Sequence, residues 1–222
     1  FALILPYFFC EHFQSLDDYA QKAYFASFVR GLKYLAFWLA ALLPGLYVCV
    51  AKFMPEVFPR QLLVRIAAAE SATPWPLFLE MVLVILLLEI VREAGLRLPK
   101  PIGHSVSLVA ALIVGDATIA AGLMSTPVLL VAGITSVAIF ITPSLYEPAT
   151  LLRLLVVLAA GLAGPVGLVS AGLFVLFGLT QVSALGVPYR NDISFSSDGV
   201  IRRNYRVLSR NPFTIWQRRK PE

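Results

Sequence analysis

The chain has 222 residues, of which 59% are hydrophobic and only 14% are charged. An ordinary soluble domain carries about 25% charged residues, and the mean hydropathy here is +0.80. A soluble globule of this size does not have enough interior to bury so much apolar surface. The composition excludes a disordered chain, a nucleic-acid-binding domain and a typical cytosolic enzyme. It predicts a protein that is solvated partly by lipid.

The first 33 residues are more polar than the rest. Residues 1–9 have a β-like pattern and lack the basic start and cleavage site of a signal peptide. Residues 10–33 are polar and aromatic. We therefore expect residues 1–33 to be the end of a truncated upstream soluble domain followed by a juxtamembrane linker.

Residues 34–189 are predicted to form a transmembrane helical domain. The first span covers 34–53 and contains Pro44, which a membrane helix tolerates at the cost of a kink. Residues 55–76 hold four prolines, and the segment 61–71 between them suits an interfacial or re-entrant helix because a span needs about 20 residues.

Four more apolar segments follow, at 76–91, 102–122, 127–142 and 154–189. The last has no charged residue and is too long for one simple span. It predicts either one long tilted helix or two helices broken near Gly164 and Pro165. The expected fold is an all-α integral membrane protein, a bundle of about four to six membrane helices with short polar flanks.

Basic residues indicate which parts face the cytoplasm. Residues 190–222 carry eight of the 18 Lys and Arg residues, so we expect a basic cytoplasmic tail. The loop at 92–100 is basic too. If the segments starting at 34, 76, 102, 127 and 154 each crossed once, this loop and the tail would lie on opposite faces. Either one segment is re-entrant or residues 154–184 cross twice.

Ionisable residues at membrane depth are costly and therefore face protein or water. Glu80 and Glu89 are nine residues apart, so they point to opposite faces of a helix and cannot form a catalytic carboxylate pair. Glu89 lies within reach of Arg92 and Glu93. We expect either a helix-end charge cluster or a gating ion pair there. Arg153 is expected to be a snorkelling anchor.

Asp116 is the one charge in the segment 102–122. Two interpretations remain open for it. Asp116 either faces water in a cation path or an interhelix contact, or it lies near the far membrane interface, because Gly122 and Ser125 follow soon after.

Small residues recur at a spacing of four, which lets helix backbones approach closely in lipid. One stripe is Ser107, Ala111 and Gly115, and the other is Ala163, Gly167 and Ala171. The sequence has no metal-ligand spacing, no glycine-rich phosphate loop and no nucleophile–base pair. It predicts no enzyme, no metal and no cofactor.

Residues 89–127, EIVREAGLRLPKPIGHSVSLVAALIVGDATIAAGLMSTP, resemble the signature of the GerA spore germination receptor A-subunit family. So do residues 9–35, FCEHFQSLDDYAQKAYFASFVRGLKYL, and 185–195, LGVPYRNDISF. The specific motif is Pro99, Lys100, Pro101, Ile102, Gly103 and His104. This chain departs from the family pattern at His104, where glutamine is expected, and at Lys100, where arginine is commoner. His104 would add pH sensitivity.

The resemblance implies a membrane subunit of a nutrient germinant receptor in the inner membrane of bacterial spores. It implies partners too: a transporter-like B subunit, a lipoprotein C subunit and further copies of the chain, which together release cations through a gated channel. Within this reading Asp116 and then Glu80 are the expected ion-path residues, with Glu89 and Arg92 as gating candidates. The alternatives are a solute transporter with a midplane site at broken helices, or an accessory protein of the same family such as stage V sporulation protein AF.

Overall fold

The computed structural model describes residues 9–13, 23–97, 113, 115–181, 183–184 and 187–188. In these ranges the chain is helical except for one short antiparallel strand pair. The elements are η1 (Phe9–Phe13), α2 (Ala23–Phe53), η2 (Pro55–Val57), α3 (Arg60–Ser71), α4 (Leu77–Arg97), α6 (Thr126–Ile139), η3 (Pro143–Leu145), α7 (Tyr146–Gln181), β1 (Ser183–Ala184) and β2 (Val187–Pro188). The prediction of a helical fold is confirmed, although the small β pair was not expected.

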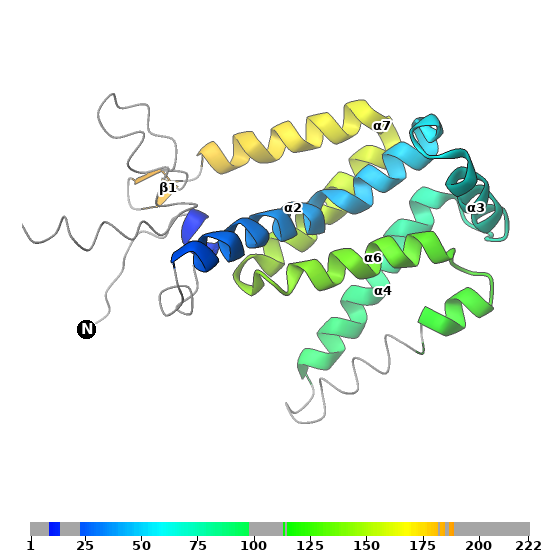
Figure 1. Ribbon diagram of the computed structural model, residues 1–222, viewed down its shortest axis with the longest axis horizontal. Helices are drawn as coiled ribbons and strands as arrows, with labels where there is room; N and C mark the ends of the chain where they lie inside the picture. Colours follow the sequence, from blue (N-terminus) through cyan, green and yellow to red (C-terminus); the bar gives the residue numbers. More distant parts are fainter. Residues whose placement is uncertain are drawn as a thin grey trace, which may run out of the picture.

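Helix α2 is the centre of the bundle and packs against α4, α6 and α7 (Figure 1). It begins at Ala23, well before the expected start at Tyr34, and therefore runs through the predicted domain boundary at 33/34. Pro44 lies inside it and does not interrupt it. Residues 23–33 thus belong to the same helix as the predicted span.

The proline-bounded segment forms the separate helix α3, as the sequence predicts. Its N-cap is Pro59 and its one buried residue is Ile66. Helix α4 continues to Arg97, beyond the expected end at residue 91. Glu93 and Arg97 are one turn apart and form a 2.9 Å ion pair, a spacing that supports helix formation.

Helix α7 reverses direction at Gly164. This residue has φ +59° and ψ −136°, a conformation that glycine adopts readily and other residues do not. Pro165 follows and cannot donate a helical hydrogen bond. Figure 1 shows the two halves of α7 running back alongside each other. Of the two alternatives for this segment, the prediction of two helices broken near Gly164 and Pro165 is therefore confirmed. The alternative of one long tilted helix is not.

The helices run up and down between two ends of the molecule (Figure 1). One end, which we call the η3 end, holds the start of α2, the end of α4 and the turn at η3. The other end, which we call the α3 end, holds η2, α3, the turn at 121–125 and the reversal at Gly164.

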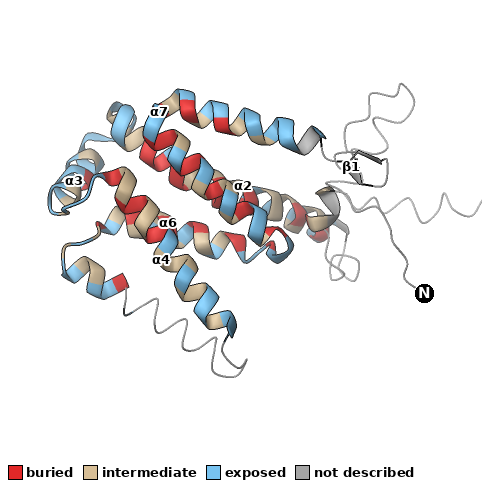
Figure 2. Ribbon diagram, turned by 180° about the vertical axis from the view of Figure 1, so that it is seen from behind, coloured by how far each residue is buried: buried red, intermediate tan, exposed pale blue. Residues whose placement is uncertain are grey.

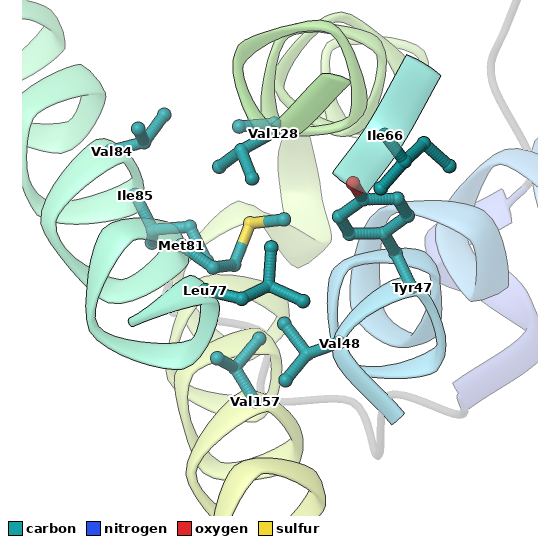
Figure 3. Close-up of a cluster of buried hydrophobic side chains, with 10 residues drawn as sticks. Tyr47, Val48, Ile66, Leu77, Met81, Val84, Ile85, Val128 and Val157 are labelled. Carbon is teal, nitrogen blue, oxygen red and sulfur yellow. The ribbon is translucent and has the colours of Figure 1, made fainter. Parts of the chain in front are cut away.

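The main hydrophobic core lies between α2, α3, α4, α6 and α7 (Figure 3). Its buried members are Tyr47, Val48, Ile66, Leu77, Met81, Val84, Ile85, Val128, Ala132 and Val157. A second cluster near the η3 end joins η1 to α2 and α7, and is made of Phe13, Phe37, Ala40, Ile139, Leu145 and Ala149.

Much of the outer side of the helices is exposed (Figure 2), and many of the exposed residues are large and apolar. On α7, Leu162 is 78% exposed, Val166 75% and Phe174 68%. Monomeric soluble proteins rarely expose apolar patches of this kind. Among the described residues, two helical stretches are long and apolar enough to cross a membrane by length and composition, Tyr24–Phe53 and Pro143–Gly178. The helix Thr126–Ile139 is apolar but shorter.

Candidate functional site

Glu89 connects α4 to α7 near the η3 end of the bundle. Its Oε1 accepts hydrogen bonds from Arg92 Nη2 at 2.6 Å and Nε at 3.1 Å. Its Oε2 accepts a 2.6 Å hydrogen bond from the hydroxyl of Tyr146, the first residue of α7. The two predicted gating residues therefore form an ion pair that also holds the start of another helix.

Two arginines complete this group, which we call the Glu89 network (Glu89, Arg92, Tyr146, Arg153 and Ser136). The Arg92 guanidinium lies 3.7 Å from the centroid of the Tyr146 ring, a favourable cation–π distance. Arg153 Nη2 lies 3.8 Å from Glu89 Oε2. Arg153 Nη1 donates a 3.4 Å hydrogen bond to Ser136 Oγ on α6. The network thus joins α4, α6 and α7.

The interpretation of Arg153 as a snorkelling anchor is wrong. Arg153 is only 3% exposed. Its guanidinium contacts residues of α4 and α6 and does not extend out of the bundle. The reason is that Glu89, on a helix 64 positions earlier in the chain, supplies a negative charge beside it. A buried cation is stable only with such a partner.

A second polar group lies at the α3 end. Glu80 is completely buried, and its Oε1 accepts a hydrogen bond from the backbone N–H of Ser125. Ser125 is the N-cap of α6, so the carboxylate of Glu80 lies at the positive end of that helix. This contact ties α4 to α6.

Tyr47 and Glu70 complete the second group, which we call the Glu80 cluster (Tyr47, Glu70, Glu80 and Ser125). Tyr47 belongs to the hydrophobic core that also contains Ile66, one turn before Glu70, and Met81, the residue after Glu80. Burial raises the pKa of Glu70 above its ordinary value, and the nearby carboxylate of Glu80 raises this pKa further. The cluster therefore gathers two acidic groups in a partly dehydrated place.

The structure keeps Glu80 and Glu89 in separate groups, which agrees with their predicted opposite faces on α4. The sequence analysis did not identify Tyr47, Glu70, Ser125 or Tyr146 as partners. Each reaches its group from a different helix, so no local spacing connects them.

Asp116 is exposed within the helical residues 115–120. This segment leads into a turn at the α3 end, where Gly122 adopts φ +64° and lies against the carbonyl of Ala72. The location agrees with the interfacial interpretation of Asp116. Its role in an ion path stays a prediction.

Within the described ranges, no group of three or more His, Cys, Asp and Glu side chains is arranged to hold a metal ion. The free thiol of Cys49 is buried in α2. The Glu89 network and the Glu80 cluster each bring together residues from different helices.

A comparison with known families matches residues 1–221 to the family described as Bacillus/Clostridium GerA spore germination protein. The chain belongs to the GerA family. This confirms the resemblance seen in residues 9–35, 89–127 and 185–195.

Several relatives of this GerA chain come from Bacillus subtilis (strain 168). Spore germination protein KA is 36% identical over 93% of this chain and 39% of its own length. Spore germination protein B1 is 34% identical over 96% of this chain and 45% of its own length. The uncharacterized membrane protein YfkQ is 30% identical over 96% of this chain and 43% of its own length. The chain thus spans less than half the length of these relatives. No solved structure matches it.

The GerA motif at residues 99–104, including His104, lies outside the described residues, as do Ser107, Ala111 and the tail from 189 onwards. Gly115 is buried, and a Cβ placed on it would lie 3.4 Å from the Leu129 side chain of α6.

In the second small-residue stripe, Gly167 and Ala171 are buried and Ala163 is exposed. Gly167 packs against the carbonyl oxygen of Ala159. This close contact joins the two halves of α7 and not two separate elements.

Proposed function

We propose that this chain is the membrane region of the A subunit of a GerA-type nutrient germinant receptor, in the inner membrane of bacterial spores. In this proposal several copies surround a gated cation path. A transporter-like B subunit and a lipoprotein C subunit assemble with them. The observation that carries the proposal is the family match over residues 1–221. Many apolar side chains of the helices face outward, and three described charged residues, Arg30, Glu80 and Arg153, are buried.

The proposed topology has six crossings. These are α2, α4, the segment at 102–122, α6 and the two halves of α7. The reversal at Gly164 supports this count, because it supplies the second crossing of residues 154–184. The basic residues between 92 and 100, which include the end of α4, and the basic tail then share one face with the start of α2, as the positive-inside rule requires.

The proposed domain organisation follows from this topology. Residues 34–189 are the transmembrane helical domain, residues 190–222 are a cytoplasmic tail, and residues 1–33 are the end of a soluble domain and a linker. Because α2 begins at Ala23, the linker enters the membrane as part of a continuous helix. A movement of the soluble domain would therefore be transmitted directly to the centre of the bundle.

The proposed opening step is a shift between two packings of the helices. The Glu89 network suits this role, since it holds α4, α6 and α7 together through one carboxylate. Germinant binding elsewhere in the receptor would favour the packing in which these contacts are exchanged for others. The intramembrane carboxylates favour cations over anions.

Two measurements on the full-length protein test the proposal. Spores that lack the gene and spores complemented with it are compared for potassium release after a nutrient mixture is added. Release that depends on the complementing gene supports the receptor role. The mass of the detergent-extracted complex is measured too, because a cation path between copies requires a closed oligomer. Equal release with and without the gene contradicts the receptor role, and a monomeric mass contradicts the channel.

One observation that favoured a solute transporter, the pair of predicted helix breaks, differs in the structure. A transporter site of this kind requires helices broken near the membrane midplane. Pro44 lies within an unbroken α2, and the break at Gly164 is a reversal at the α3 end of the bundle (Figure 1). Saturable solute uptake by the purified protein alone would restore this alternative.

A further inference from the structure

Four side-chain oxygen atoms of the Glu80 cluster are buried and have no hydrogen-bond partner among the described residues. They are Glu80 Oε2, Glu70 Oε1, Tyr47 Oη and Ser125 Oγ. Nearly all buried polar atoms in proteins are hydrogen-bonded, since an unpartnered one costs about 1–3 kcal/mol. Four such atoms from one cluster indicate that something else contacts them.

The four residues come from four parts of the fold and lie along the same core. Glu70 follows the core residue Ile66 by four positions, and Glu80 precedes Val84 by four. Residues so spaced share a helix face, so both carboxylates continue the core-facing side of their helices. Ser125 is placed by its backbone bond to Glu80.

Tyr47 is itself a core residue and is only 8% exposed. Figure 3 shows its ring projecting from α2, with the hydroxyl directed toward α3 and α6. These are the helices that carry Glu70 and begin at Ser125. The hydroxyl is therefore directed toward the two helices that position Glu70 and Ser125.

The negative charge of this cluster has no basic partner in the part of the chain that the structure describes. Glu80 is completely buried and forms no ion pair there. The basic side chains of the α3 end are exposed, and one of them, Lys52, donates to the carbonyl of Gly161. An isolated buried carboxylate is not stable in a medium of low dielectric constant, so it requires either a proton or a bound cation.

We propose that Glu80, Glu70, Tyr47 and Ser125 form a binding site for a hard inorganic cation. Carboxylate and hydroxyl oxygens are ligands for such ions, and the cluster contains no sulfur or imidazole that would select a softer metal. A cation would neutralise the two carboxylates, and the hydroxyl groups of Tyr47 and Ser125 would add oxygen ligands. The site is independent of the proposed function, because a receptor subunit can act without it and a protein with another role can contain it.

The test uses the purified full-length protein in detergent at constant ionic strength. Choline chloride, whose cation is too large for the site, is replaced stepwise by NaCl, KCl, MgCl₂ or CaCl₂, and the thermal unfolding midpoint is measured. A ligand that binds only the folded state raises this midpoint in a saturable way. We expect such a rise with at least one of the four salts, and the salt that gives it identifies the ion.

Matched variants show which residues the salt-dependent rise of the unfolding midpoint requires. Glu80→Gln keeps the shape and removes the charge, and should raise the half-saturating salt concentration roughly tenfold or more. Tyr47→Phe removes one oxygen and should have a smaller effect in the same direction. Glu56→Gln, at an exposed glutamate on the same end of the molecule, should leave the response unchanged. If Glu80→Gln does not fold, Tyr47→Phe and Glu70→Gln carry the comparison.

Three outcomes would overturn the proposal. One is an identical midpoint in choline and in all four salts. Another is an unchanged response in Glu80→Gln and Tyr47→Phe, which would place the cation elsewhere. The last is a Glu80→Gln protein whose unfolding midpoint exceeds that of the wild type equally in choline and in every salt, which would show that no cation compensates the charge of Glu80.

Discussion

The ammonium group of Lys52 donates a 2.9 Å hydrogen bond to the carbonyl oxygen of Gly161. Gly161 lies in the last turn before the reversal of α7, and the residue four positions later is Pro165, which has no N–H to offer. Lys52 therefore caps the first half of α7 from the end of α2. The positive charge also interacts favourably with the carbonyl end of that helix.

Replacing Lys52 by Met should destabilise the reversal. The variant loses one hydrogen bond from a charged donor, which contributes about 1 kcal/mol at a partly exposed position. We expect a lower thermal unfolding midpoint in detergent for Lys52→Met and an unchanged one for Arg65→Met, an exposed cation on α3. An equal midpoint for wild type and Lys52→Met would show that the contact contributes nothing.

Replacing Gly164 by Ala should have a larger effect. The combination of φ +59° and ψ −136° at Gly164 is unfavourable for a residue with a Cβ, at a cost of about 1–3 kcal/mol. A Cβ there would also lie 3.0 Å from the Phe53 ring. Gly172→Ala is the control, since nothing lies within 4 Å of its Cβ position. Thermal midpoints of both variants measure the difference, and equal midpoints would contradict a reversal at Gly164.

The Glu89 network should be cooperative. Glu89→Gln removes the carboxylate from both Tyr146 and the buried Arg153, so it should destabilise the protein more than Glu93→Gln. The ion pair of Glu93 with Arg97 is exposed, and such pairs contribute about 0.3–0.5 kcal/mol.

A double-mutant cycle of Glu89→Gln with Tyr146→Phe checks this coupling, because the two residues share one hydrogen bond. We expect the destabilisation of the double variant to be smaller than the sum of the two single effects. Strictly additive effects would mean that the two side chains act independently.

Glu70 should make stability depend on pH. Its pKa is raised in the folded state by burial and by Glu80, so the folded protein binds this proton more tightly than the unfolded chain does. The stabilisation is present below the raised pKa and is lost as pH rises through it. In choline chloride, Glu70→Gln should therefore raise the thermal midpoint at about pH 7.5 and change it little at about pH 4.5. The same effect at both values would contradict this assignment.

The six-crossing topology predicts the sidedness of two exposed glutamates. Glu56 lies at the α3 end and Glu147 at the η3 end. In a background with Cys10 and Cys49 replaced, Glu56→Cys should react with a membrane-impermeant maleimide added outside intact cells. Glu147→Cys should react only after the membrane is permeabilised. Labelling of both from the same side would exclude the topology.

Replacing Asp116 by Asn tests whether its carboxylate takes part in cation movement. If it lies in the cation path, Asp116→Asn in the full-length protein weakens ion release after germinant addition while protein levels stay normal. Unchanged ion flux would remove Asp116 from the mechanism and leave the interfacial interpretation, which its exposed position already favours.

The sequence by itself determined that the chain is a set of apolar helices of the GerA family. Hydropathy and proline spacing are local properties, so they located α3, the start of α4, α6 and the break at Gly164 to within a few residues. They misjudged the end of α4, because a helix continues past its apolar residues when charged pairs such as Glu93 and Arg97 support it. They also misjudged the start of α2, where Arg30 and Lys33 are part of the helix.

Only the tertiary structure decided which polar residues meet. Three contacts join parts of the chain that are far apart in sequence. Glu89 and Arg153 are 64 positions apart. Glu80 and Ser125 are 45 positions apart, and Lys52 and Gly161 are 109 apart. The physical reason is that a buried charge must find its partner wherever packing brings one close, and packing is a property of the whole bundle. Arg153 shows the difference most clearly, since its place at the start of an apolar run predicted an exposed anchor and the fold made it a buried interhelical contact.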